Sequence, residues 1–165
     1  MPTPAYMTII GSRQGYITEK NFTPGSVGNI WQEGHENEIM VQSFRHGITL
    51  PRDFLTGQPT GQRVHGPLEI TKIVDKSSPL LLRAMTSGEI LTSVEMKLFR
   101  TSNQGLEEQY FTILLEDAVI ASIRTYMPHC QEQERRHLGH MEDVEFTYRK
   151  ITKTHEVAST SESDD

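Results

Sequence analysis

The chain has 165 residues, 35% of them hydrophobic and 23% charged, and this length and balance predict one globular domain rather than a disordered or collagen-like chain. Its formal charge of -6 argues against a general nucleic-acid binder, because contact with phosphates requires a concentrated basic surface. Cys130 is the sole cysteine, which excludes an intrachain disulfide. The first residues, MPTPAYMTII, have neither a basic segment nor a long apolar run, so we expect no secretory signal and no membrane span there.

Two short strands and a long loop are predicted in the first part of the chain. Residues 5–10 and 38–44 are apolar runs of strand length, bounded by Gly, Asn, Pro and Ser. The sequence RDFLTGQPTGQRVH, residues 52–65, has little apolar periodicity and contains Gly and Pro, which predicts an exposed loop or an extended hairpin tip. Loops of this length are often functional, so contact with a partner chain and a disordered excursion are both open interpretations.

The segment PLEITKIVDKSSPLLLRAMTSGE predicts a strand followed by the best-signalled helix of the chain. Its LEIT portion alternates apolar and polar side chains, as a half-buried strand does. A helix is expected at about residues 77–87, because Ser77 or Ser78 can accept a bond from an unpaired amide and Pro79 suits the first helical turn. Gly88 can adopt the left-handed conformation that ends a helix.

Strands dominate the rest of the chain. Residues 94–98 alternate cleanly, residues 109–115 are apolar in both phases, and residues 119–127 follow an acidic pair, so the three are predicted to form a meander. After a polar connection, a last strand is expected from residue 144 to about residue 154. The final residues are short, polar and acidic, so we expect a mobile tail.

A mainly β fold follows from this pattern. About eight strands, one helix and no β-α-β alternation favour a β-barrel or β-sandwich over a parallel sheet. The helix carries Leu80, Leu81, Ala84 and Met85, and it has no partner helix, so this apolar face should cover a sheet or an open barrel mouth. We expect a barrel domain over residues 1–157 and a disordered tail over residues 158–165.

Metal-binding and cofactor signals are weak. His137 and His140 lie near Glu142 and Asp143, but Gly139 interrupts any helix that would bring the two histidines together. Surface histidines leading into a strand explain the pattern more simply. The chain has no Gly-rich phosphate-binding motif and no G-x-S-x-G motif, so we predict no metal, no cofactor and no catalytic residues.

Two acidic pairs leave a hydrolase as an alternative. Glu116 and Glu142 are each followed by an aspartate, and two carboxylates can act as general acid and as base or nucleophile. Adjacent residues of a strand point to opposite faces, so each pair supplies at most one group to a site. Surface charge at strand ends is the simpler explanation.

Three sequence blocks carry a resemblance to a known family. The run TGQRVHGPLEITKIVDKSSPLLLRAMTSGE, with SVGNIWQEGHENEIMVQSFRHGI upstream and HMEDVEFTYRKITKTHE near the end, closely resembles the Hcp family, over residues 1 to about 157. These haemolysin-coregulated proteins form the inner tube of the bacterial type VI secretion system. The resemblance implies a β-barrel of two antiparallel sheets with one flanking helix, and no catalysis.

The resemblance also implies assembly, partners and location. Members form hexameric rings that stack into a tube, leave the cell with a spike protein, and carry or protect small effectors in the lumen. The expected partners are therefore copies of this chain, spike, sheath or baseplate proteins, and effectors, with no nucleic acid and no membrane insertion. The expected location is the bacterial cytoplasm before firing, followed by the exterior or a target cell. An effector-binding adaptor remains a further alternative.

Ring assembly suggests roles for two segments, because a closed ring uses two different patches of each subunit. The loop at residues 52–65 is the candidate arm to a neighbouring subunit or ring. Ser43 and Arg45 are the candidate lumen-facing residues, with the opposite phase, Gln42 and Phe44, nearly as well supported. The candidate arm residues are Arg52, Asp53, Phe54, Gln58, Arg63 and His65.

Overall fold

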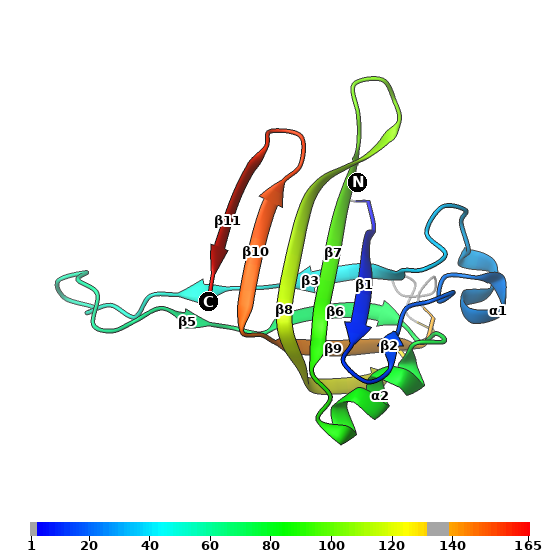
Figure 1. Cartoon of the computed structure of the whole chain (residues 1–165), viewed down its shortest axis with the longest axis horizontal. Helices are drawn as coiled ribbons and strands as arrows, with labels where there is room; N and C mark the ends of the chain where they lie inside the picture. Colours follow the sequence, from blue (N-terminus) through cyan, green and yellow to red (C-terminus); the bar gives the residue numbers. More distant parts are fainter. Residues whose placement is uncertain (1–2, 132–138) are drawn as a thin grey trace.

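The computed structural model describes residues 3–131 and 139–165, and it contains a closed, antiparallel β-barrel (Figure 1). Neighbouring strands pair in the order β8-β7-β1-β3-β6-β9, and pairing of β9 with β8 closes the circle. The expectation of a mainly β fold is confirmed. The barrel strands are β1 (Ala5–Gly11), β3 (Ile39–Arg45), β6 (Leu68–Ile73), β7 (Leu91–Thr101), β8 (Glu107–Tyr126) and β9 (Met141–Thr147).

Strand β8 is shared by the two sides of the barrel. Its first half pairs with β7, and its second half pairs with β9. In Figure 1, β3, β6 and β9 run across the direction of β1 and β7, so β8 must turn from one sheet into the other. The turn coincides with Asp117, whose φ is 51°, and with a register shift between Ile120 and Ser122. The prediction of two separate strands broken at Glu116–Asp117 was wrong, because the acidic pair bends one strand instead of ending it.

The end of the chain also differs from the prediction. The expected last strand is two strands, β9 and β10 (Lys150–His155), and β11 (Thr160–Asp164) pairs along β10. The expectation of a disordered tail at residues 158–165 was therefore wrong. Hydroxyl pairs across the two strands, Thr152 with Ser163 at 2.9 Å and Thr154 with Ser161 at 3.1 Å, join the backbone bonds. The sequence of this hairpin shows no alternation of apolar residues, because polar side chains and backbone hydrogen bonds stabilise it.

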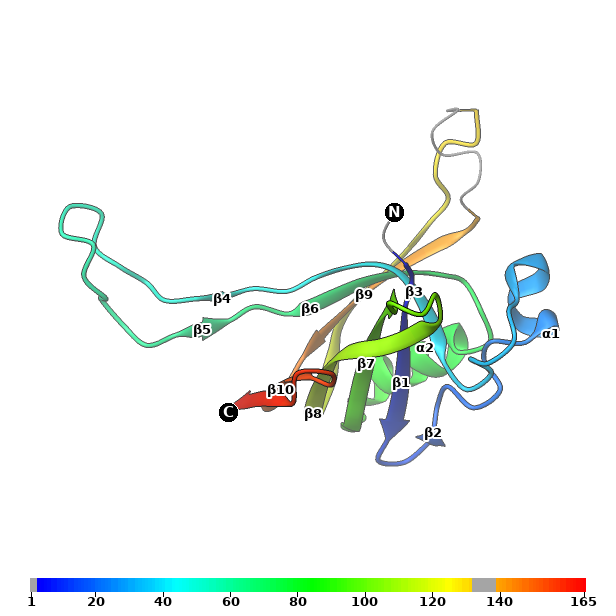
Figure 2. The same cartoon turned by 90° about the horizontal axis from the view of Figure 1, so that it is seen from above.

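The remaining elements are short. β2 (Gly15–Tyr16) pairs with the end of β1, and α1 (Pro24–Val27) and the 3-10 helix η1 (Gly28–Ile30) lie in the connection to β3. A two-stranded hairpin, β4 (Ile48–Thr49) and β5 (Val64–His65), leaves the barrel between β3 and β6. Figure 2 shows the connection between β4 and β5 extending far beyond the barrel.

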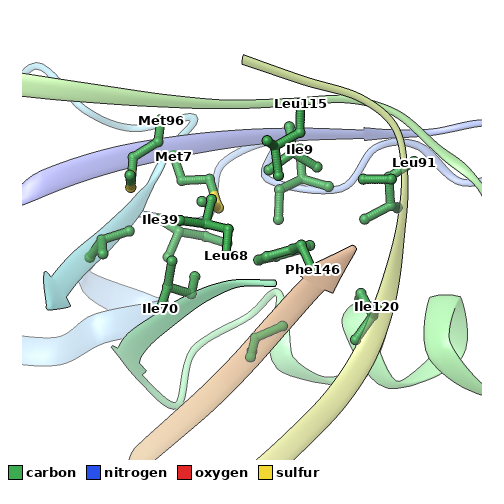
Figure 3. Packing of buried hydrophobic residues seen from close by; sticks show 14 of the residues in the cluster. Met7, Ile9, Ile39, Leu68, Ile70, Leu91, Met96, Leu115, Ile120 and Phe146 are labelled. Atoms are coloured by element: carbon green, nitrogen blue, oxygen red, sulfur yellow. The ribbon is translucent and has the colours of Figure 1, made fainter. Parts of the chain in front are cut away.

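Apolar side chains from all six barrel strands meet inside the barrel (Figure 3). Burial of these side chains is the main stabilising contribution to the fold, at about 1.5–3 kcal/mol for each large apolar side chain. The labelled core residues are Met7, Ile9, Ile39, Leu68, Ile70, Leu91, Met96, Leu115, Ile120 and Phe146.

Helix α2 (Ser78–Ser87) packs one face against this core, close to the predicted bounds. Leu81 and Ala84 are buried, and Leu80 packs partly against the core. The helix ends at Gly88, which has the predicted left-handed conformation with φ of 65°. Met85 was expected on the packed face, but it lies at the edge and is 36% exposed.

A buried ionic cluster fixes the start of α2. The ammonium of Lys72 is fully buried and lies 2.8 Å from a carboxylate oxygen of Glu142 and 3.0 Å from one of Asp75. Ser78 donates to the same oxygen of Glu142 at 2.7 Å, and Asp75 accepts the amide of Ser77 at 3.0 Å. Neither serine side chain caps the helix as predicted. The carboxylate of Asp75 organises this turn.

Candidate functional site

The arm, which we define as residues 46–66, is an ordered hairpin. Ile48 pairs with His65 and Thr49 with Val64, and an isolated bridge joins Arg52 to Pro59 further out. Figures 1 and 2 both show it projecting away from the barrel on the side opposite α1. The sequence was compatible with a disordered loop or with a segment that contacts a partner chain. The structure has a paired hairpin at this place.

The arm tip is a tight turn that presents two apolar side chains. A carboxylate oxygen of Asp53 accepts the amides of Leu55 at 2.7 Å and Thr56 at 3.2 Å, and the backbone of Asp53 pairs with Gln58. These bonds fix the turn, yet Phe54 is 104% and Leu55 is 96% exposed. Two fully exposed large apolar side chains on an ordered turn are typical of a contact surface.

The base of the arm is joined to the end of the chain. His65 forms a hydrogen bond of 2.8 Å with the hydroxyl of Tyr148 and one of 2.6 Å with a carboxylate oxygen of Asp164. Arg63 donates to the other carboxylate oxygen of Asp164 at 2.6 Å. The hydroxyl of Tyr148 also lies 2.7 Å from His46. Of the six candidate arm residues, Arg63 and His65 belong to this base, and the other four lie at or near the tip.

Ser43 and Arg45 lie on the outer face of the barrel. A register shift between Val41 and Ser43 changes the phase of β3, after which Ser43 pairs with Thr71 and Arg45 with Glu69. Arg45 forms an ion pair with Glu69 at 3.0 Å, which raises the pKa of the guanidinium. Both candidate residues thus share a polar face.

Phe44, from the alternative phase of β3, lies on the opposite face of the strand from Ser43 and Arg45. Phe44 pairs with Ile70, whose side chain is fully buried, so Phe44 belongs to the core side at the end of the barrel. There it lines an open groove of about 530 Å³ with Leu98, Phe99 and Tyr110. No local sequence pattern indicates this groove, because its walls come from separate strands.

A second apolar surface follows α2. Four large apolar side chains on the helix and the adjoining strand ends are more than a third exposed: Ile10, Leu82, Met85 and Ile90. We call them the α2 surface. The sequence pattern showed an apolar helix but could not show that part of its apolar surface stays uncovered within the subunit.

The structure does not bring the two hydrolase candidates together. Glu142 is buried in its ionic cluster with Lys72, whereas Glu116 is part-exposed and lies 3.8 Å from Lys150. Nine positions of β8 and the bend at Asp117 separate Glu116 from Thr125, the backbone partner of Glu142. The two carboxylates have different partners, whereas a catalytic pair needs both groups at one site.

Within residues 3–131 and 139–165, no three His, Cys, Asp or Glu side chains group as metal ligands. His137, one of the two histidines considered for a metal, lies outside these residues. The helices described by the structure include none that is long and apolar enough to cross a membrane.

Comparisons with known proteins agree with this architecture. The family described as "Type VI secretion system effector, Hcp" matches residues 6–155. The Major exported protein of Pseudomonas aeruginosa is 59% identical over 165 residues, which is all of this chain and 96% of that protein. A crystal structure described as Hcp protein has a TM-score of 0.94 and 45% identity, covering 98% of this chain and 96% of its own. The secreted protein Hcp3 from Pseudomonas aeruginosa has a TM-score of 0.85 and 53% identity, covering 99% and 97%. This chain belongs to the Hcp family.

Proposed function

We propose that this chain is a subunit of the inner tube of a bacterial type VI secretion system, and that six copies close into a ring that stacks with others. The full-length match to the Hcp family carries this proposal. Two features of the subunit support it. The arm tip and the α2 surface both carry exposed apolar side chains. Figure 1 shows that the arm and α2 lie at different parts of the barrel. A ring or stack needs two different, complementary patches on each subunit.

The mass of the particle in solution tests ring formation. Size-exclusion chromatography with light scattering should give about six times the mass of one chain, because a closed ring has a defined copy number. A strictly monomeric species over a wide range of protein concentration would contradict the proposal.

The outer face of β3, β6 and β9 is the proposed lumen wall. Ser43 and Arg45 lie on it beside Glu69, Thr71 and Asp143, and Asp143 accepts a bond from Thr71 at 2.9 Å. A polar wall suits a lumen that holds small effector proteins without fixing them by apolar contact. Acting as a carrier, the tube subunit would bind effectors before export.

We propose that the chain is made in the bacterial cytoplasm and exported with a spike protein, through contacts with sheath and baseplate proteins. The name of the Pseudomonas aeruginosa relative, Major exported protein, supports export. The fate outside the producing cell, whether release or delivery to a target cell, depends on the system that fires the tube.

The arm tip is the proposed contact between rings, and its removal should prevent stacking. The double variant Phe54→Ser and Leu55→Ser should form rings but no tubes, because both side chains are fully exposed within the subunit. Burial of two such side chains is worth about 3–6 kcal/mol per subunit, so ring–ring affinity should fall more than about 100-fold. Sedimentation of tubes measures this.

A matched control separates the arm from general loss of apolar surface. Leu106 is 66% exposed in the loop between β7 and β8, and Leu106→Ser should leave stacking unchanged. Equal loss of tubes in both variants would contradict a specific role for the arm. An unmodified chain that binds effectors but never stacks would favour the effector-binding adaptor over the tube subunit.

A further inference from the structure

The open groove at one end of the barrel, of about 530 Å³, has walls from β1, β3, β7 and β8. It includes the start of β1 and the end of β7, which pair with each other. Ile10 and Ile90 of the α2 surface lie at the other ends of these two strands, so the groove and the α2 surface are at opposite ends of one sheet. Apolar and aromatic residues form most of the lining: Ala5, Val41, Phe44, Leu98, Phe99 and Tyr110.

Phe44 is the exposed aromatic side chain of this groove. It is 40% exposed, although its strand partner Ile70 is fully buried. An aromatic side chain that lines a hollow and stays this exposed is typical of a surface that a partner covers. The arm of the same chain does not cover it, because Figures 1 and 2 both show the arm tip far from the barrel. The occupant must therefore come from another molecule.

The arm tip has a shape and chemistry that complement the groove. Phe54 and Leu55 project, fully exposed, from a turn that two hydrogen bonds to Asp53 fix. Because the turn is ordered before any contact, its docking loses little conformational entropy. Aromatic and aliphatic anchors that enter an apolar pocket are the usual centre of a stable interface.

The charges of the tip and the groove are also complementary. The tip sequence DFLTGQ, residues 53–58, carries one charged side chain, Asp53. Among the described residues that line the groove, Arg100 is the one charged side chain. Its Nε donates to Glu108 at 2.8 Å and its guanidinium lies 4.8 Å from the ring centre of Tyr110, so the other N–H groups remain for a carboxylate. Such a pair orients a docked segment, while apolar burial provides most of the affinity.

We propose that this groove is the docking site for the arm tip of a second copy of the chain, in the next ring of the stack. The inference rests on the proposed stacking of rings through the arm, and it adds the surface to which the arm binds. Tip and groove are two different patches of one subunit, so each copy can bind the next in an open series, as a stack requires. The α2 surface, at the other end of the sheet, stays available for ring closure.

Cross-linking of assembled tubes tests this contact directly. Cys130, the native cysteine, is first replaced with serine, and Leu55→Cys and Thr101→Cys then place one thiol on the tip and one at the groove. A flexible bismaleimide should join two chains, and mass spectrometry of the digest should find position 55 linked to position 101. The link should be present in sedimented tubes and absent from dilute, unstacked rings.

Three outcomes would overturn the groove assignment. Tubes that sediment normally without the link would do so, as would tubes in which the tip links instead to Leu82→Cys on the α2 surface. The same link in dilute rings would place the contact within a ring. Light scattering of the unmodified chain is a separate measurement: if it shows neither rings nor stacks, the proposed function fails and the groove loses its proposed partner with it.

A variant of the groove itself gives an independent test. Phe44→Ser should keep rings and lose tubes, with ring–ring affinity reduced at least about tenfold, because the tip loses an aromatic contact. Phe44→Leu keeps an apolar wall and should still form tubes. Stacking of Phe44→Ser rings with the affinity of unmodified rings would overturn the proposal.

Discussion

Replacement of Lys72 with methionine is expected to reduce the free energy of unfolding by about 3–5 kcal/mol. Lys72 is fully buried, and its ammonium lies within 3.0 Å of Asp75 and Glu142. Methionine fills similar space but leaves two buried carboxylates without a cation, and an uncompensated buried charge is more destabilising than loss of the pair itself. The start of α2 should loosen first, because Asp75 organises that turn.

Urea denaturation at matched subunit concentration measures this effect. Lys150→Met is the control, since Lys150 pairs with Glu116 at 3.8 Å and both side chains are more than a third exposed. Loss of that pair should cost less than about 1 kcal/mol. If the two variants were destabilised equally, the buried cluster would not have the stabilising role assigned to it.

Two neighbouring positions of α2 should separate folding from assembly. Leu81→Ala removes a fully buried side chain, which should reduce stability by about 2–5 kcal/mol and lower the melting temperature by about 4–20 °C. Met85→Ser changes a side chain that is 36% exposed on the α2 surface. We expect it to shift the subunit's stability by less than about 1 kcal/mol and to weaken ring formation instead.

Thermal unfolding and light scattering distinguish these effects. Met85→Leu keeps an apolar side chain of similar volume, so rings of this variant should persist. The assignment of the α2 surface to assembly would be wrong if Met85→Ser formed rings as stable as those of Met85→Leu. It would also be wrong if Leu81→Ala left the melting temperature unchanged while abolishing rings.

Local sequence patterns were sufficient to predict many of the strands and the helix α2. The strands at residues 5–10 and 38–44 and the helix near residues 77–87 were predicted within a few residues, because apolar periodicity and helix-ending residues are local signals. The bend at Asp117 was not predictable in this way. An acidic pair occurs both in turns and in strands, and only closure of the barrel decides that β8 continues.

Contacts between segments that are far apart in the chain could not be predicted from the sequence. His46, His65, Tyr148 and Asp164 are spread over more than a hundred residues, and none of them stands in a recognisable motif. The polar residues at the end of the chain show no apolar alternation, although they form β11, whose Asp164 contacts the base of the arm. The expectation of a ring and a tube came from the resemblance to the Hcp family, because residue patterns within one chain do not reveal its assembly.

The orientation of Ser43 and Arg45 shows a similar limit. Strand alternation left two phases open, and the register shift after Val41 decides which residues face outward. Such a shift changes the face of every later side chain in the strand. The sequence of β3 alone does not encode it.

Electron microscopy of the purified protein tests the central claim, that this chain is a ring-forming tube subunit. The account predicts class averages of rings with six-fold symmetry and, at high concentration, stacks in which the arm of one ring touches the next. Particles no larger than a single subunit, or closed dimers with no ring at any concentration, would contradict it.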